Sequence, residues 1–270
     1  MMGPRPKPAG RDFSALTEAT GTPLSREGAD MVYSRYAYGA ELAAGARVLE
    51  IACGSGQGVG MLRERASFVV GGDIDQGLLR RAKLHYGRRA RLACLDACDL
   101  PFPAGSFDLV LFFEALYYVP APSRALDEVA RVLAPEGRVV VVNANPERPD
   151  FIRSPRSFTY HTADALRREL EARGLEVRVE GAYPAGESGL LGRAAPAIRR
   201  VMEALGLVPR TLAGRARLKR LLLGPLISLP PEITAGFGSA AERVPLPAGA
   251  ASGYKVLYVT GSKPRDIFSG

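Results

Sequence analysis

The sequence predicts an α/β fold built on a mostly parallel, doubly wound sheet. Between residues 45 and 145, short apolar segments alternate with segments of helical length, a rhythm typical of βαβ units. Three acids, Glu50, Asp73 and Asp96, follow successive apolar runs at an equal spacing of 23 residues. Parallel strands end at one edge of their sheet, so we expect these carboxylates to border one crevice, where open α/β sheets bind ligands.

The individual elements follow in chain order. Ser25 is expected to cap a helix that runs to about residue 43, with Glu27 in its first turn. Apolar runs without strict alternation, typical of strands covered on both faces, predict strands at 48–51, 68–72, 91–95, 107–112, 138–142, 175–179 and 254–259. Helices are expected between them at 57–65, 76–86, 123–133 and 162–173. Ser123 is expected to cap the third of these helices and the Pro-Glu-Gly segment at 135–137 to stop it, while Gly174 ends the last.

The composition is that of an ordinary globular chain, with 47% hydrophobic and 24% charged residues. No apolar run approaches the roughly 18 residues of a membrane span. The basic, proline-rich segment 1–11 lacks the apolar core of a secretory signal. Cys53, Cys94 and Cys98 have neither a further pair nor a nearby histidine to complete a zinc site. We therefore expect reduced thiols in a cytoplasmic protein, and no bound metal.

A glycine-rich turn at 54–58 (GSGQG) joins the first predicted strand to the following helix. Such a turn lets a ligand approach the backbone closely, and the helix N-terminus adds unpaired N–H groups. Dinucleotides and S-adenosylmethionine are the two ligand classes bound in this way. The dinucleotide spacing G-x-G-x-x-G fails, because Val59 or Met61 stands at the third glycine position. The sequence also lacks a G-x-x-x-x-G-K phosphate loop.

Glu50, Ala52, Gly54 and Gly56 resemble the first motif of the class I S-adenosylmethionine-dependent methyltransferases, E-x-G-x-G-x-G, with Ala52 in place of the first glycine. Further likeness to the small-molecule branch of this family (methyltransferase type 11) lies at 100–102, 106–108 and 130–137, so the resemblance spans about residues 45–145. It implies a Rossmann-like sheet of seven strands with an antiparallel last strand. It also implies S-adenosylmethionine as the cofactor and S-adenosylhomocysteine as the product.

The resemblance assigns roles to side chains around the turn. Asp73 resembles the acid that binds both ribose hydroxyls, since both oxygens of a carboxylate can accept, and Asp75 is better placed to cap the next helix. Taken alone, Asp73 could instead be a helix cap and Glu50 an exposed strand end. Arg35 either pairs with the methionine carboxylate or is solvated. The expected cofactor contacts are Glu50, Ala52, Gly54, Gly56, Asp73, Ile74, Asp96, Ala97, Phe113, Glu114, Arg35 and Tyr36.

Two further pairs complete these implied contacts. Asp96 with Ala97 resembles the pair beside the adenine, where a carboxylate accepts from the exocyclic amine. Phe113 and Glu114, after the fourth strand, are expected to border the sulfonium. Enzymes that methylate amine nitrogens of nucleobases carry an acid or Asn followed by Pro-Pro-aromatic at this point, and the sequence lacks that motif. The segment 143–146 (NANP) is superficially similar but follows the wrong strand.

Three side chains are candidates for the acceptor side. Tyr117 and Tyr118 either face the acceptor or pack in the core. His161 is either a general base for a hydroxyl acceptor, for which a near-neutral pKa is suited, or a structural residue. His85 is expected near a helix C-terminus, where it interacts with the helix dipole. A base is not required, because in-line positioning of the acceptor alone accelerates transfer.

The chain is expected to form a flexible tail at 1–24 and one domain at 25–270, with a helical lid inserted at about 184–252. The segment 193–220 holds eight basic residues against one acid. It is interpreted as a helical cap with a solvated basic face, as a surface for a membrane or an anionic or lipid-linked acceptor, or, least favoured, as a nucleic-acid site, since no aromatic platform accompanies the charge. The sequence does not indicate an oligomeric state.

The favoured function is transfer of a methyl group to a small-molecule acceptor, a hydroxyl of a sugar or secondary metabolite. The alternatives within enzymes are an amine or a carbon acceptor, such as a quinone-like ring or a lipid-linked group. The alternative outside enzymes is a module that binds the cofactor without transferring its methyl group. No motif in the lid identifies the acceptor.

Overall fold

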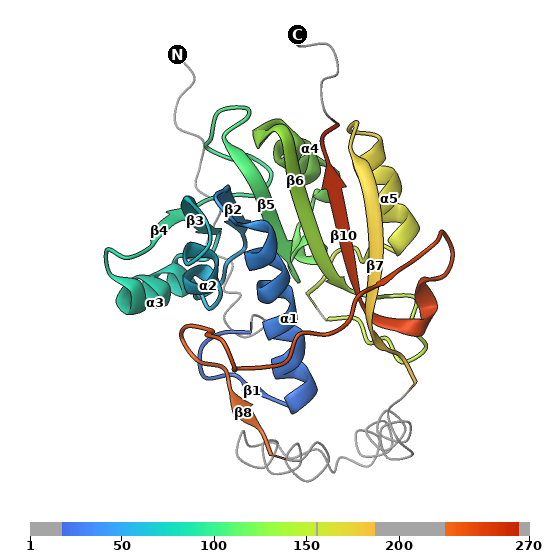
Figure 1. The fold of residues 1–270 in the computed structure, drawn as a ribbon, viewed down its shortest axis with the longest axis horizontal. Helices are drawn as coiled ribbons and strands as arrows, with labels where there is room; N and C mark the ends of the chain where they lie inside the picture. Colours follow the sequence, from blue (N-terminus) through green and yellow to red (C-terminus); the bar gives the residue numbers. More distant parts are fainter. Residues whose placement is uncertain (1–17, 155, 187–224, 265–270) are drawn as a thin grey trace.

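The computed structural model describes residues 18–154, 156–186 and 225–264 (Figure 1). Its centre is an eight-stranded sheet in the order β4-β3-β2-β5-β6-β10-β7-β9. These strands are β2 (Arg47–Ile51), β3 (Phe68–Asp73), β4 (Arg91–Cys94), β5 (Phe107–Phe113), β6 (Leu133–Ala144), β7 (Glu176–Pro184), β9 (Val244–Pro245) and β10 (Tyr254–Ser262). The strands from β4 to β6 are parallel, and β10 lies antiparallel between β6 and β7. The predicted fold is confirmed, with the short β9 added at one edge.

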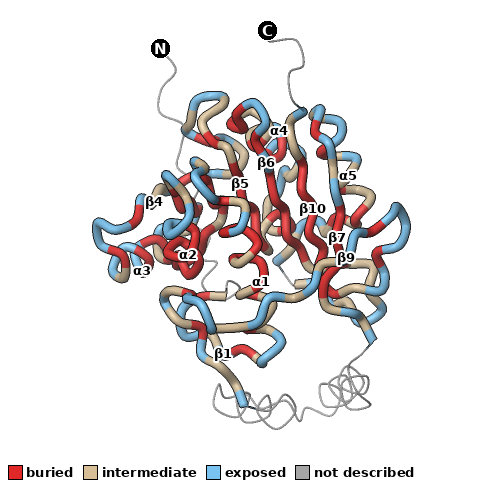
Figure 2. The backbone as a smooth tube through the Cα atoms, viewed as in Figure 1, coloured by how far each residue is buried: buried red, intermediate tan, exposed pale blue. Residues whose placement is uncertain are grey.

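Helices cover both faces of the sheet. One face packs against α1 (Arg26–Leu42), α2 (Val59–Arg63) and α3 (Gln76–Tyr86), and the other against α4 (Pro122–Val132) and α5 (Ala163–Glu171). Alternate strand residues serve the two layers, because successive side chains of a strand point to opposite faces. Val48 and Leu109 therefore belong to the α1 layer, and Leu49 and Val110 to the α4 layer. Figure 2 shows the buried residues concentrated along the central strands.

Side-chain caps fix where several helices begin. Ser25 accepts a hydrogen bond from the N–H of Gly28 (3.1 Å) at the start of α1, as predicted. Thr162 caps α5 in the same way. The cap predicted for α4 is wrong: the helix begins at Pro122 without a side-chain cap, and the Ser123 hydroxyl instead contacts Glu169 on α5 (3.1 Å). Proline in the first turn has no N–H to satisfy, which removes part of the need for a cap.

The segment 135–137 does not form the expected separate turn. It lies within β6, which begins at Leu133 directly after α4. Glu136 has φ = 59°, and the pairing of β6 with β5 shifts register between Phe107 and Leu109. The residues at 135–137 therefore form an irregular start of β6, similar to a β-bulge, instead of a turn before the strand. The strand predicted to begin at 175–179 is β7, which continues to Pro184.

The two ends of the predicted scheme also differ from expectation. Residues 18–24, predicted to belong to the flexible tail, pack on the domain, and β1 (Pro23–Leu24) pairs with β8 (Ile227–Ser228). Most of the predicted helical lid, including 193–220, lies outside the described residues. Its described parts, 184–186 and 225–252, contain the end of β7, then β8, β9 and the start of the 3₁₀ turn η2 (Ala251–Gly253), but no α-helix.

Candidate cofactor and acceptor site

A cavity of about 670 Å³ opens at the carboxyl ends of β2, β3 and β5. This volume is typical of small-molecule sites, and the location agrees with the crevice rule for open α/β sheets. Its wall includes many of the residues that the sequence singles out: Arg35, Tyr36, Ala52, Gly54, Asp73, Ile74, Asp96, Ala97, Phe113, Glu114, Tyr117 and Tyr118. The lining also contains residues that sequence reasoning missed, among them Glu18, Gln57, Cys98 and Leu229.

The glycine-rich turn is held open by backbone conformations that favour glycine. Gly54 has φ = 59° and Gly56 has φ = 80°, and Ala52 adopts φ = 59° although it carries a Cβ. Gly54 lines the cavity, while Gly56 does not. Gly56 instead lies over α3, where its carbonyl accepts from the Tyr86 hydroxyl (2.8 Å) and a Cβ would meet the Tyr86 ring. Gly54 therefore borders the site, and Gly56 shapes the turn behind it.

Asp73 ties the end of β3 to this turn. One carboxylate oxygen accepts from the N–H of Gly54 (2.8 Å) and the other from the N–H of Asp75 (2.8 Å). Each oxygen keeps a lone pair for a further donor. Burial raises the pKa of Asp73, and the two N–H donors oppose this rise by stabilising the charged form. Asp75 caps α3 through the N–H groups of Gly77 and Leu78, as predicted.

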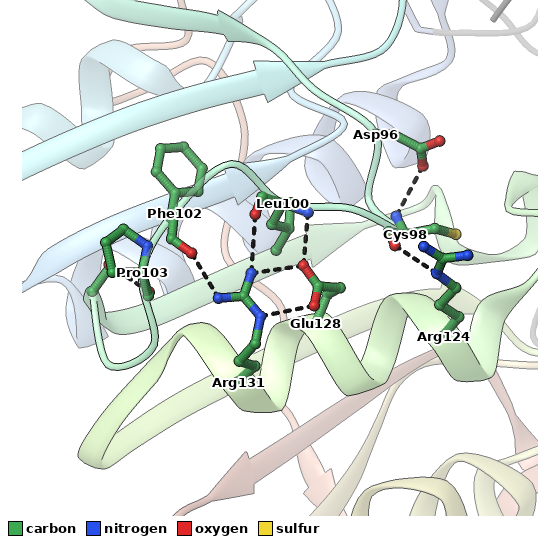
Figure 3. A network of polar contacts seen from close by, with 9 residues as sticks. Asp96, Cys98, Leu100, Phe102, Pro103, Arg124, Glu128 and Arg131 are labelled. Carbon is green, nitrogen blue, oxygen red and sulfur yellow. Dashed lines mark hydrogen bonds and ion pairs between the residues drawn. The ribbon is translucent and has the colours of Figure 1, made fainter. Parts of the chain in front are cut away.

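Asp96 lies after β4 on a loop that α4 braces (Figure 3). Its carboxylate accepts from the N–H of Cys98 (2.8 Å), and Arg124 donates to the Cys98 carbonyl (2.9 Å). Further along α4, Glu128 accepts from a loop N–H (2.8 Å), while Arg131 donates to two loop carbonyls (2.7 and 2.9 Å). Two arginines of one helix thus hold the loop that presents Asp96 to the cavity.

Glu50 is placed differently from the prediction of a direct contact. It is 1% exposed and does not line the cavity. One carboxylate oxygen accepts from the Tyr36 hydroxyl (2.7 Å), and the other has no partner. Burial raises the pKa of Glu50 to about 7, against the stabilising Tyr36 hydrogen bond and the Arg35 charge. The Tyr36 ring fits there because Gly58 has no side chain. A Cβ at that position would lie 1.8 Å from the ring.

Arg35 lies beside Tyr36 on α1 and is only 8% exposed. Its guanidinium forms an ion pair with Glu18, which precedes β1. The Glu18 carbonyl accepts from the Gln57 amide (2.8 Å), so the N-terminal segment lies against the glycine-rich turn. The structure therefore excludes the solvated alternative for Arg35. No sequence signal indicated Glu18, because it lies in a polar segment without periodicity.

Glu114, Tyr117 and Tyr118 line another part of the cavity. Glu114 has φ = 49°, and its carboxylate accepts from the Tyr117 hydroxyl (2.8 Å) and the N–H of Ala144 (3.2 Å). The Tyr117 ring stacks on Tyr160 with centroids 4.4 Å apart, and it contacts Tyr118 at 4.6 Å. Burial raises the pKa of Glu114, while the Arg35 charge opposes the rise. Tyr117 and Tyr118 thus line the cavity while also packing against each other.

Both histidines lie away from the cavity lining. His161 is 8% exposed, its Nδ1 has no partner, and burial lowers its pKa. It directly precedes the Thr162 cap of α5 and does not reach the cavity, so the structure does not bring it to the site as a base. His85 lies in the last turn of α3, as predicted, but its side chain pairs with Glu232 (2.7 Å).

Among the residues that the structure describes, no helix is both long and apolar enough to cross a membrane. Within the same ranges, no group of three or more His, Cys, Asp or Glu side chains could hold a metal ion.

Residues 49–141 match a family model described as methyltransferase domain (Methyltransf_11). The matched segment runs from within β2 to within β6 and so contains the glycine-rich turn, Asp73 and Asp96. The match agrees with the resemblance of this part of the sequence to the class I S-adenosylmethionine-dependent methyltransferases.

Individual relatives extend this finding. The demethylmenaquinone methyltransferase of Clavibacter sepedonicus is 39% identical over 100 residues, which are 36% of this chain and 41% of that protein. The 27-O-demethylrifamycin SV methyltransferase of Amycolatopsis mediterranei is 32% identical over 136 residues, 48% of this chain and 47% of that protein. The match thus covers less than half of the length of either relative.

The fold is also similar to solved structures. A SAM-dependent methyltransferase from Archaeoglobus fulgidus superposes with a TM-score of 0.58 and 16% identity, covering 88% of this chain and 96% of that one. At this identity the comparison supports the fold alone. It extends the likeness well beyond the segment that the family model matches.

Proposed function

We propose that the protein is an S-adenosylmethionine-dependent methyltransferase that acts on a hydroxyl group of a small molecule, such as a sugar or secondary metabolite. The observation that carries the proposal is Asp73, a buried carboxylate that lines the cavity and joins the end of β3 to the glycine-rich turn. Asp96 lies at the same sheet edge, after the neighbouring strand.

The residues present fit the cofactor. Asp73 has acceptor capacity on both oxygens for the ribose hydroxyls, and Asp96 can accept from the adenine amine. The Arg35 Nε is buried without a partner in the cavity wall, where an anionic group of the ligand would satisfy it. Phe113 adds an apolar surface beside Glu114. S-adenosylmethionine, when bound, supplies a methyl group activated by a sulfonium.

The chain itself then positions the acceptor, and a base at the site adds to the acceleration by taking its proton. Tyr117, stacked on Tyr160, gives one wall of the cavity a fixed position, and such positioning supplies much of the acceleration of a two-reactant step. Glu114 is the carboxylate at this end of the cavity, and burial raises its pKa. We infer that a Glu114 oxygen takes the proton of the acceptor hydroxyl, in place of His161.

The choice of an oxygen acceptor rests on two supports. One relative, the 27-O-demethylrifamycin SV methyltransferase, is named for an oxygen position. The sequence after β5 lacks the motif of enzymes that methylate nucleobase amines. An amine, a quinone-like carbon or a lipid-linked group remains the second hypothesis, and the demethylmenaquinone methyltransferase relative favours the quinone-like acceptor among these.

Turnover tests the proposal directly. Purified protein is incubated with S-adenosylmethionine and a panel of hydroxyl, amine and quinone-like acceptors, and release of S-adenosylhomocysteine is followed by mass spectrometry together with the methylated product. We expect a product with the added mass of one methyl group on oxygen. A protein that binds the cofactor but methylates no acceptor supports the binding-module alternative instead.

Two broader proposals accompany this function. We propose that the chain from residue 18 onward forms one cytoplasmic domain, and its three free cysteines support a reducing compartment. We also propose that the insertion at 184–252 shapes the acceptor site, as Leu229 in the cavity wall suggests. Vesicle flotation with anionic lipids tests whether the basic segment 193–220 contacts a membrane.

A further inference from the structure

A cluster of exposed cations on α3 lies outside the cavity lining. Residues 76–95 contain six cations and no acid. Arg80, Arg81 and Lys83 are exposed along α3, and Arg88 is exposed just after the helix ends. The ion pairs among the described residues include none of these four side chains. Their charges are therefore available to a partner outside the chain.

Leu84 lies among these cations and is 87% exposed. On the helix surface it neighbours Arg80, four residues earlier, and Arg81, three residues earlier. It is separate from the apolar side of α3 that packs on the domain, which is formed by Leu78, Leu79, Ala82 and Tyr86. Core packing thus does not explain this leucine. We call Leu84 and the four cations the α3 basic face.

The α3 basic face does not stabilise its own helix. Arg80 and Lys83 are three residues apart, and like charges at this spacing are unfavourable in a helix. An acid at position 84 could pair with Arg80, but leucine stands there. The helix dipole favours cations in the last turn, which includes Lys83 but neither Arg80 nor Arg81. A contact with another molecule would compensate both the repulsion and the exposed leucine.

We propose that the α3 basic face binds the surface of a membrane that contains anionic phospholipids. The cations pair with the anionic headgroups, to which such clusters are attracted, and Leu84 inserts between the headgroups. The location permits this contact, because α3 lies beside the edge strand β4 at one end of the molecule (Figure 1). The inference does not depend on which acceptor is methylated.

Two other anionic partners fit this face less well. Proteins that bind single-stranded nucleic acid combine cations with exposed aromatic rings on which bases stack. Here Tyr86 is 2% exposed, and the Arg91 guanidinium lies over the Phe68 ring (4.5 Å). An acidic protein partner would bury a larger apolar core than one leucine offers. A single apolar side chain among cations agrees best with the interface of an anionic bilayer.

Co-sedimentation with vesicles tests the charge contribution. Vesicles of phosphatidylcholine mixed with phosphatidylserine are compared with vesicles of phosphatidylcholine alone, at low and high salt. The α3 variant combines Arg80→Gln, Arg81→Gln, Lys83→Gln and Arg88→Gln, whereas Leu84→Gln keeps every charge. The control variant has the same net charge as the α3 variant, because it removes four exposed cations on other elements: Arg26→Gln, Arg138→Gln, Arg168→Gln and Arg178→Gln.

The wild type is expected to bind the anionic vesicles and to lose most of this binding at high salt, which screens exposed charges. The α3 variant should bind at least about a hundredfold more weakly, since each cation near such a surface contributes about fivefold. Leu84→Gln should bind about tenfold more weakly, because glutamine gains less from burial among lipids. The control variant should stay within about twofold of the wild type. Thermal unfolding checks that every variant is folded.

Fluorescence tests the position of residue 84 directly. The chain contains no tryptophan, so Leu84→Trp places a single indole at the proposed contact. Its emission should shift to shorter wavelength when anionic vesicles are added, as the ring leaves water. Ile152→Trp is the matched control, since Ile152 is also exposed (50%) but precedes α5, away from α3. Its emission should not change.

Three results would overturn the proposal. The first is an α3 variant that binds anionic vesicles as tightly as the control variant, because any binding then depends on net charge or on another surface. The second is Leu84→Trp protein that binds the vesicles without a change in emission. The third is a wild type that binds no vesicle but binds single-stranded RNA through the same four cations, which would identify a nucleic-acid surface instead.

Discussion

Ala52 occupies a backbone conformation that an L residue rarely adopts. Its φ of 59° costs an alanine roughly 1–2 kcal/mol, whereas glycine loses about 0.5–1 kcal/mol through chain entropy. Ala52→Gly is therefore expected to raise the free energy of unfolding by about 0.5–1 kcal/mol. Urea denaturation at pH 7 measures the change. A clear loss of stability would show that the Ala52 methyl group contributes packing that outweighs the strain.

Asp73, the last residue of β3, and Asp75, the cap of α3, should differ in their effect on cofactor binding. Asp73→Asn removes the charge and one acceptor from the ribose site, so S-adenosylhomocysteine affinity should fall about tenfold to a hundredfold. Asp75→Asn retains an oxygen for the N–H groups of Gly77 and Leu78 and should bind normally. Isothermal titration compares the two variants. Unchanged affinity in Asp73→Asn would refute the ribose assignment.

At the scale of elements, a buried hydrogen bond joins α1 to β2 beneath the site. The Tyr36 hydroxyl donates to Glu50 on β2, and Gly58 before α2 leaves room for the Tyr36 ring. The Tyr36 side chain therefore contacts both β2 and the start of α2 and holds them against α1. The second Glu50 oxygen has no partner, so ionisation of this acid is costly in the folded state.

This contact predicts a specific pH dependence of stability. The folded protein holds the Glu50 proton up to about pH 7, whereas a free glutamate loses it near 4.5. The folded state thus binds more protons between these values, so the contribution is complete below pH 4.5 and is lost as pH rises to 7. Glu50→Gln keeps an acceptor for Tyr36 and cannot ionise.

Chemical denaturation from pH 4 to 8 measures the effect. Relative to the wild type, Glu50→Gln should gain stability on the order of 1–3 kcal/mol as pH rises through this window. Asp73 and Glu114 titrate in both proteins, so their contributions largely cancel in the difference. A difference that does not vary with pH would mean that Glu50 is ionised at little cost in the folded protein.

The central strands were predictable because their apolar runs are long and unambiguous, and β2 and β5 lie close to their expected bounds. The start of β6 was not, since the residues at 135–137 have the chemistry of a turn and are drawn into the sheet by pairing with β5. The two-residue strands β1 and β8 leave no periodic signal.

Some residues of the candidate site could likewise be predicted from the sequence, and others could not. Asp73 and Asp96 were predictable because strand ends of a parallel sheet converge, which local patterns and topology together imply. Glu50 was predicted at the right strand end, but the sequence does not tell which face of β2 meets α1, and the Glu50 carboxylate contacts Tyr36 instead of lining the cavity. Glu18 was missed, since only tertiary contacts bring this segment to Arg35.

On the scale of the whole molecule, two segments far apart in sequence, 18–24 and 227–233, meet beside the cavity. The N–H of Gly21 donates to the Leu229 carbonyl (2.8 Å), and that of Leu229 to the Thr22 carbonyl (2.9 Å). Ile233 donates to the Gln57 carbonyl (2.7 Å), which links this small sheet to the glycine-rich turn. Glu18 and Leu229 both line the cavity, so the residues that flank β1 and β8 contribute to its wall from outside the central sheet.

This arrangement predicts that cofactor binding protects two segments far apart in sequence. A ligand held in the cavity stabilises the closed pairing of β1 with β8 by about 2.7 kcal/mol at a hundred times its Kd, provided that opening of the pair releases the ligand. Amide exchange at 18–24 and 227–233 should therefore slow by up to about a hundredfold with S-adenosylhomocysteine. Hydrogen–deuterium exchange with mass spectrometry measures both segments, and α5, which does not line the cavity, is the internal control. Protection confined to the glycine-rich turn, with β1 and β8 exchanging as before, would show that the small sheet opens independently of the site.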